Sequence, residues 1–271
     1  MSQNVNELLG AAQQQGVLSG QSASALAVAN IGAQIQGALG MPAEDIDASE
    51  VVLVSLLIDD SGSIRFKQNS QVVRDGHNTV VDALKGAKLA NDVMIHCRYL
   101  NGTVLYPYGL LDNAAEMNSG NYNPNGGTPL YDQTLVLLGA VVAKSQEFMN
   151  QGVPVRTVSC IITDGADEHS SSEADDVKKV VDDMLVQETH IVCGLGIPGI
   201  DYVDYSQVFR DMGIRDEWIL TPSDDPKKIR EAFQTVSDSA VAVSQSAQSF
   251  TQAALGGGFN VASSTPVAVN P

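Results

Sequence analysis

Residues 51–63, with the sequence VVLVSLLIDDSGS, constrain the fold of this chain more than any other stretch. The stretch begins with apolar and β-branched residues interrupted only by Ser55, which is typical of a strand buried on both faces of a parallel sheet. It ends in a run of acidic and small residues, Asp59, Asp60, Ser61, Gly62 and Ser63, and a helical pattern follows. In an open α/β sheet such a turn lies at the carboxyl edge, where ligands bind.

Two later stretches place oxygen-bearing side chains at similar boundaries. Residues 125–130, NGGTPL, carry Thr128 on a glycine-rich loop just before a helical pattern. Residues 161–165, IITDG, end a second strand that is expected to be buried, and Asp164 follows it. Carboxylate and hydroxyl oxygens suit a hard cation such as Mg²⁺, Mn²⁺ or Ca²⁺. The three stretches together therefore indicate a divalent metal site.

The series D-x-S-x-S, then T, then TDG, resembles the metal-ion-dependent adhesion site (MIDAS) of von Willebrand factor type A (VWA) domains, over about residues 50–248. The matching positions, none of which departs from the family pattern, are Asp59, Ser61, Ser63, Thr128 and Asp164. The resemblance implies that the serines contact the metal directly, that the aspartates act largely through water, and that the threonine engages when a ligand is bound. The alternative for the first turn, taken alone, is a helix cap.

The resemblance also implies one bound divalent cation, with an open position for a Glu or Asp carboxylate of a protein partner. We expect Mg²⁺ or Mn²⁺ before Ca²⁺, because two hydroxyls and few direct carboxylates make a small site. Asp60, Asp167 and Glu168 form a candidate partner-binding rim, which basic residues of the partner would face. Plain exposure is the preferred alternative for Asp60, and a solvated loop is the alternative for the other two.

Strand patterns alternate with helical patterns along the chain, which predicts an α/β fold. Strands are expected at 51–58, 93–100, 103–108, 155–163, 190–197 and 217–220, and helices at 64–88, 113–117, 129–150, 173–187, 205–212 and 226–250. Asn101-Gly102 predicts a hairpin, and Pro107 fits an edge strand. We therefore expect a doubly wound, mostly parallel six-stranded sheet with helices on both faces. Its order 3-2-1-4-5-6, with one antiparallel edge strand, comes from the VWA resemblance.

Four regions are expected. Residues 1–43 form an N-terminal helical extension rich in Gln and Ala, 44–50 an acidic linker, 51–250 the VWA domain, and 251–271 a flexible C-terminal tail. The extension carries one charge, Glu7, and two helical patches. Docking on the chain's own domain is one interpretation of these helices; disorder, a second partner contact and self-association are the alternatives.

The net charge of −17, from 15 Lys and Arg against 32 Asp and Glu, disfavours nucleic acid and anionic membranes as partners. Three cysteines, Cys97, Cys160 and Cys193, fall within expected strands and lack metal-ligand spacing, which favours free thiols in a reducing compartment. No leader pattern and no apolar run of about 18 residues is found in the sequence. The expectation is a cytoplasmic protein.

No set of residues suggests a nucleophile, so we expect no enzyme. The G-x-G-x-x-G at 194–199 resembles a dinucleotide fingerprint, but it begins inside an expected strand and Pro198 interrupts it. The preferred function is a metal-dependent adaptor, similar to stand-alone bacterial VWA proteins of the tellurite-resistance and stress-response type. The alternative is the VWA subunit of a MoxR- or chelatase-type AAA+ ATPase system. A metal-dependent phosphohydrolase is disfavoured, since only Asp60 and His169 lie where a base is needed.

Overall fold

The computed structural model describes residues 4–87, 90–199 and 203–245. Six strands form one sheet in the order β3-β2-β1-β4-β5-β6, and only the β2–β3 pair is antiparallel. The strands are β1 (Val51–Ile58), β2 (Val93–Tyr99), β3 (Val104–Leu110), β4 (Val155–Thr163), β5 (His190–Gly196) and β6 (Ile219–Leu220). The predicted sheet, its strand order and its antiparallel edge are confirmed.

The centre of the sheet determines where the polar strand ends meet. Every residue of β1 is buried, and β1 pairs in parallel with β4 from Val51↔Val155 to Ile58↔Ile162. Asp59 N continues the ladder by donating to Ile162 O at 2.9 Å. The residues that follow the two strands therefore lie side by side at the carboxyl edge, although about a hundred positions separate them in the sequence.

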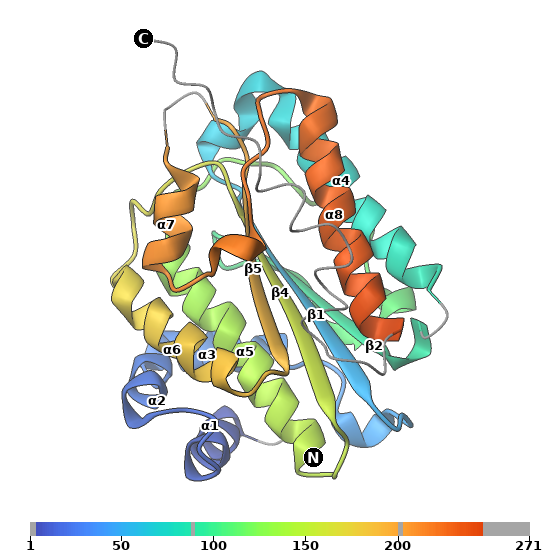
Figure 1. Cartoon of the computed structure of the whole chain (residues 1–271), viewed down its shortest axis with the longest axis vertical. Coiled ribbons are helices and arrows are strands. Elements are labelled where there is room, and N and C mark those ends of the chain that lie inside the picture. Colours follow the sequence, from blue (N-terminus) through green and yellow to red (C-terminus); the bar gives the residue numbers. More distant parts are fainter. Residues whose placement is uncertain (1–3, 88–89, 200–202, 246–271) are drawn as a thin grey trace.

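Helices cover both faces of the sheet. Figure 1 shows α4 (Asn69–Lys85) and α8 (Pro226–Gln245) on one side and α5 (Leu130–Met149) and α6 (Ala174–Val186) on the other. A 3₁₀ turn, Gly62–Gln68, precedes α4, so the α-helix begins later than predicted. None of the helices in the described part of the chain is long and apolar enough to cross a membrane.

Helix α7 (Tyr205–Asp211) explains the glycines of the G-x-G-x-x-G pattern. A Cβ on Gly194 would lie 2.6 Å from the Phe209 ring, and one on Gly196 would lie 2.3 Å from the Tyr205 ring. Gly194 and Gly196 therefore let α7 pack closely on β5, which gives these two glycines a packing role. The helix predicted at 113–117 is wrong, because only Leu111–Asn113 form a 3₁₀ turn there.

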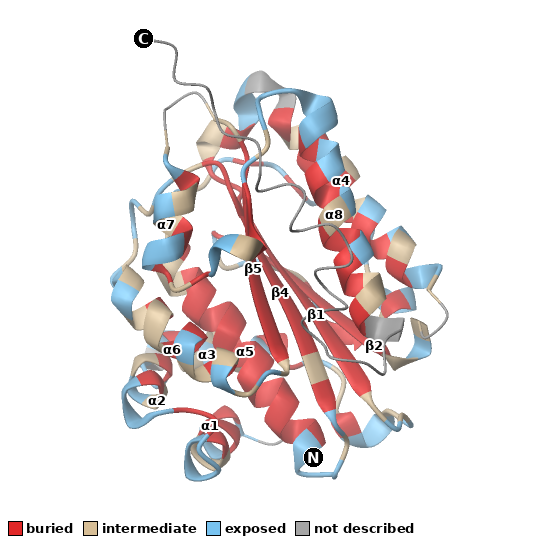
Figure 2. Cartoon of the chain, in the orientation of Figure 1, coloured by how far each residue is buried: buried red, intermediate tan, exposed pale blue. Residues whose placement is uncertain are grey.

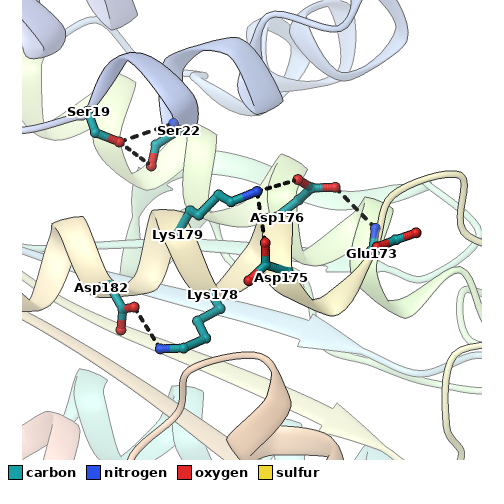
Figure 3. A network of polar contacts seen from close by, with 8 residues as sticks. All are labelled: Ser19, Ser22, Glu173, Asp175, Asp176, Lys178, Lys179 and Asp182. Carbon is teal, nitrogen blue, oxygen red and sulfur yellow. Dashed lines mark hydrogen bonds and ion pairs between the residues drawn. The ribbon is translucent and has the colours of Figure 1, made fainter.

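Three N-terminal helices, α1 (Val5–Gln14), α2 (Gly20–Leu26) and α3 (Ala29–Ala38), lie outside α5 and α6 as a further layer (Figure 1). There are three helices rather than the two expected, because a turn at residues 27–28 separates α2 from α3. Ser19 caps α2 by accepting from Ser22 N at 3.2 Å, and its own N–H donates to Asp183 of α6 at 2.6 Å. Figure 3 shows this cap beside the charged surface of α6, where Lys179 pairs with Asp175 and Asp176.

A buried ion pair fastens the segment after α3. The Lys144 side chain of α5 is fully buried, and its Nζ donates to Glu147 Oε2 at 2.7 Å and to Met41 O. Glu147 Oε1 accepts from Ala43 N at 3.3 Å. Gly40 has a φ of 58°, and a Cβ there would lie 2.1 Å from Tyr108 O, so only glycine lets the segment approach β3 this closely.

Candidate metal centre

The carboxyl edge of the sheet brings the predicted metal-site residues together. A pocket of about 260 Å³ opens between the turn after β1, the loop before α5 and the turn after β4. Four of the predicted residues line it: Ser61, Ser63, Thr128 and Asp164. Asp59 lies beneath the pocket and is fully buried. The arrangement follows from the β1–β4 pairing, which sets the two aspartate-bearing strand ends next to each other.

Asp59 organises the floor of the site rather than facing the pocket. Its Oδ1 accepts from Ser61 N at 2.7 Å. Its Oδ2 accepts from Thr163 Oγ1 at 2.7 Å and from Asp164 N at 3.2 Å. Both carboxylate oxygens are therefore occupied by donors from the two turns, and Asp59 holds those turns in a fixed relation.

The pocket itself has a set of oxygen ligands around one incompletely paired carboxylate. Ser63 Oγ donates to Asp164 Oδ1 at 2.7 Å, Ser61 Oγ donates to the same oxygen at 3.3 Å, and the two hydroxyls lie 2.8 Å apart. Asp164 Oδ2 is buried and has no hydrogen-bond partner within the described residues. Among the described residues that line the pocket there is no lysine or arginine. These oxygens fit a divalent cation, which would supply the positive charge that the site lacks.

The pKa of Asp164 also favours a cation in this pocket. Burial and the neighbouring Asp59 carboxylate raise the pKa of Asp164 from 3.8 to about 7, against the lowering effect of the two serine hydroxyls. A carboxylate that is buried beside another carboxylate ionises at a cost unless a cation is present. Across the described ranges no three His, Cys, Asp or Glu residues gather as a metal cluster, so a cation here would depend on the hydroxyl oxygens.

Backbone hydrogen bonds join the loop that carries Thr128 to the turn after β1. Gly62 N donates to Gly126 O at 3.1 Å, and Gly126 N donates to Asp60 O at 3.0 Å. Thr128 N donates to His169 Nδ1 at 3.2 Å. A Cβ on Gly127 would lie 2.8 Å from that same His169 nitrogen, so glycine is needed for the ring to cover the loop.

The structure changes the predicted rim. Asp60 is not exposed: its side chain is buried, its Oδ1 accepts from Asn101 N at 3.0 Å, and burial raises its pKa to about 6. Asp167 is half-buried, and its Oδ1 accepts from Tyr131 N at 3.1 Å in the first turn of α5. Glu168 is exposed and lines the pocket. Of the three rim candidates, Glu168 is the one that is exposed and also lines the pocket.

Sequence reasoning missed two residues that shape the site. Thr163, the last residue of β4, donates its hydroxyl to Asp59, and Tyr122 donates its hydroxyl to Asp59 O from the loop before α5. Thr163 had one available signal, since a hydroxyl-bearing residue stood between the apolar Ile161-Ile162 and Asp164. Tyr122 had none, because its contact depends on how a long polar loop folds back.

The three cysteines, Cys97, Cys160 and Cys193, are free and buried within strands, as predicted. They lie inside the sheet and contribute nothing to the pocket.

Neither protein-family models nor curated proteins gave a match to this sequence. Solved structures do resemble it. The pilus adhesin SpaC from Lactobacillus rhamnosus GG, in an open conformation, matches with a TM-score of 0.51 at 15% identity, over 73% of this chain and 31% of the adhesin chain. A von Willebrand factor type A protein from Catenulispora acidiphila matches with a TM-score of 0.50 at 20% identity, over 72% and 43%.

Proximal thread matrix protein 1 from the mussel byssus, solved with a zinc-occupied MIDAS motif, matches with a TM-score of 0.47 at 19% identity, over 72% of this chain and 47% of that one. The zinc belongs to the mussel protein. This chain spans less than half the length of each of these three solved chains. The likeness to the Catenulispora protein shows that this chain has the fold of a VWA domain.

Proposed function

We propose that this chain, with its VWA fold, is a metal-dependent protein-binding module and not a catalyst. The observation that carries the proposal is the pocket of Ser61, Ser63, Thr128 and Asp164, in which one buried carboxylate oxygen has no partner among the described residues. A bound divalent cation would supply a positive position that accepts a carboxylate from another protein. Oxygen-only ligands in a small pocket favour Mg²⁺ or Mn²⁺ over Ca²⁺.

Each residue has a proposed part. The hydroxyls of Ser61 and Ser63 hold the cation directly, because they already converge on Asp164 at the pocket floor. Asp59 orients the backbone and hydroxyl donors around it, since both of its oxygens are taken. Thr128, from the opposite wall, engages mainly when a partner is bound. Glu168 at the edge of the pocket favours a basic residue of the partner beside its acidic one.

Calorimetry tests the metal site. Titration of Mg²⁺ or Mn²⁺ into the chelator-stripped, dialysed protein should show one site. Ser61→Ala combined with Ser63→Ala should remove it without unfolding the protein, because both serines lie on a turn rather than in the core. The matched control is Ser171→Ala combined with Ser172→Ala, on a turn whose N–H groups bind Asp132 instead. Absence of binding to the folded wild type would refute the metal site.

Affinity capture tests the partner. Proteins retained by the wild type should be released by a chelator, whereas moderate salt should only weaken their binding, because exposed ion pairs contribute little and are screened. Thr128→Ala should weaken partner binding more than metal binding. Retention of the same proteins at unchanged affinity in excess EDTA would mean that another surface, such as the N-terminal helices, makes the interaction.

A further inference from the structure

A second pocket, of about 740 Å³, lies beside the metal centre. Its walls come from α3, the β2–β3 turn and α5, through Asn30, Gln34, Asn101, Gly102 and Gln133. It shares Gly127 and His169 with the metal pocket, so the two open next to each other. The protein carries 32 acidic residues, yet none of the described residues that line this pocket carries a carboxylate.

A buried cation lies behind the pocket wall. Arg98 of β2 is fully buried, and its Nη2 donates to Gln34 Oε1 at 2.8 Å and to Gln133 Oε1 at 2.6 Å. Its Nε and Nη1 have no hydrogen-bond partner, and no ion pair to it is found, in the part of the chain that the structure describes. Buried guanidinium groups are ordinarily paired with a carboxylate, so this one lacks its usual counter-charge.

Gln34 and Gln133 connect Arg98 with the pocket, because both accept hydrogen bonds from it and both line the pocket. Both side-chain carbonyls accept from Arg98, so hydrogen-bond donation by these two side chains falls to their amide nitrogens. Gln133 Nε2 uses one donor on Gln34 Oε1 at 3.2 Å, and Gln34 Nε2 uses one on Asn30 O at 3.3 Å. Each amide nitrogen has a second hydrogen, and a carboxylate is the natural acceptor for donors backed by a positive charge.

We propose that this pocket is a carboxylate-binding subsite formed by Gln34 and Gln133 over Arg98. It takes a second Asp or Glu of the same partner segment that presents its first carboxylate to the metal centre. That second statement rests on the proposed function, whereas carboxylate binding by the pocket does not. Because Gln34 lies on α3, the N-terminal helices form part of the binding surface.

The direct test uses protein stripped of metal and dialysed free of chelator. Glutarate is titrated while NMR follows the side-chain amide resonances of Gln34 and Gln133, with the neutral diamide glutaramide as the control. Glutarate should shift both resonances saturably, with weaker binding at higher salt, and glutaramide should not. No shift with glutarate, or equal shifts with glutaramide, would overturn the subsite.

Two matched pairs of variants locate the binding. Gln133→Ala should weaken glutarate binding about tenfold, the loss of roughly one hydrogen bond to a charged group. Gln146→Ala, a buried glutamine on the same helix that is remote from this pocket, should leave it unchanged. Gly102→Ala should weaken it too, because the added Cβ would lie 3.1 Å from Gln34 Oε1. Gly152→Ala should leave glutarate binding unchanged, because its φ of 78° is close to the 87° of Gly102 but a Cβ there would have nothing within 4 Å. Wild-type affinity in Gln133→Ala would refute the assignment.

A metal arm separates this proposal from the previous one. In Mg²⁺, a peptide with two glutamates should bind the wild type more tightly than one with a single glutamate, and Gln133→Ala should abolish only that difference. If peptides respond to Mg²⁺ but the second glutamate adds nothing, the subsite fails while the metal function stands. If no peptide responds to Mg²⁺ but glutarate still shifts the glutamines, the metal function fails and carboxylate binding by the pocket stands.

Discussion

Asp164 shows at the scale of one residue how a binding site opposes stability. The pKa of its carboxyl rises from 3.8 to about 7 in the folded protein. The folded state thus holds this proton more tightly than the unfolded chain. The stabilisation is fully present below about pH 4 and is lost as the pH rises to about 7. Without metal, the protein should therefore become less stable across this range.

Asp164→Asn should remove that dependence. In metal-free buffer, the difference in melting temperature between variant and wild type should grow in the variant's favour from pH 4 to pH 7. Comparing the two cancels the parallel effect of Asp60, whose pKa is also raised, to about 6. Added Mg²⁺ should then raise the melting temperature of the wild type most at high pH and leave the melting temperature of the variant unchanged. Parallel pH profiles for the two proteins would contradict this account of Asp164.

Thr163 offers a second residue-scale prediction. Thr163→Val keeps the shape of the side chain but removes the hydroxyl that donates to Asp59 Oδ2 at 2.7 Å. We expect a loss of about 1–3 kcal/mol in the free energy of unfolding, because a buried carboxylate loses a donor, and weaker Mn²⁺ binding by calorimetry. Thr134→Val is the control: Thr134 is equally buried, and its hydroxyl has no partner among the described residues, so urea unfolding should detect no loss.

At the scale of the element, α5 is buried on nearly every side, which Figure 2 shows along its length. A helix that is buried on nearly every side needs cover on both faces, and α1 and α3 supply the outer cover. Gly139→Leu should displace α3, because even a Cβ there would lie 2.4 Å from Ile35 Cδ1, and proteolysis of the N-terminal helices should become faster. Gly37→Ala, on α3 with nothing within 4 Å, should instead stabilise by up to about 1 kcal/mol. Equal proteolysis rates for Gly139→Leu and the wild type would contradict this.

The ion pair on α5 belongs to the same scale. Lys144→Met leaves Glu147 buried without its cation, and removal of one partner from such a pair costs about 3–5 kcal/mol. Urea unfolding should show this loss, whereas Lys178→Met should change stability by only ~0–1 kcal/mol, since Lys178 and Asp182 are both about half exposed. Similar losses in the two variants would show that the buried pair does not fasten the segment after α3.

The elements that sequence predicts well are those whose pattern is set locally. Strand β1 is buried on both faces and is apolar at every position but Ser55, β4 has the apolar run 160–162 near its end, and the Asn101-Gly102 turn and Pro107 identify the hairpin edge. Residues 113–117 are not a helix, because the Asn78 side chain binds both the N–H and the C=O of Met117. That contact joins positions 39 apart in the chain and leaves no local pattern.

The candidate site also contains some residues that the sequence could name and others that only the fold shows. Asp59, Ser61, Ser63, Thr128 and Asp164 could be named from the sequence because each stands at the end of a recognisable strand or at the start of a helix. The burial of Asp60 could not, because it depends on Asn101, which the β2–β3 turn brings over it. The buried cation Arg98 likewise sits in an apparently ordinary strand, and only the fold shows that two glutamines meet it.

For the whole molecule, the β1–β4 pair should be the last part to open. Both strands are buried and have neighbours on each side, whereas β3 and β6 lie at the two ends of the sheet. Native-state hydrogen exchange should therefore find the amides of β1 and β4 among the slowest, and those of β3 and β6 faster. Fast exchange in either central strand would contradict the proposed order of stability.

Both ends of this sheet are also poor templates for another chain. Strand β6 has only two residues, and β3 carries Pro107, which has no N–H to offer. Met41 N occupies the neighbouring carbonyl of Tyr108 at 2.8 Å, so the segment fastened by Lys144 also covers the β3 end. At the β3 end, one fewer carbonyl is therefore open to a strand of another copy, and the close approach that Gly40 permits should lower the tendency of the folded protein to aggregate through this edge.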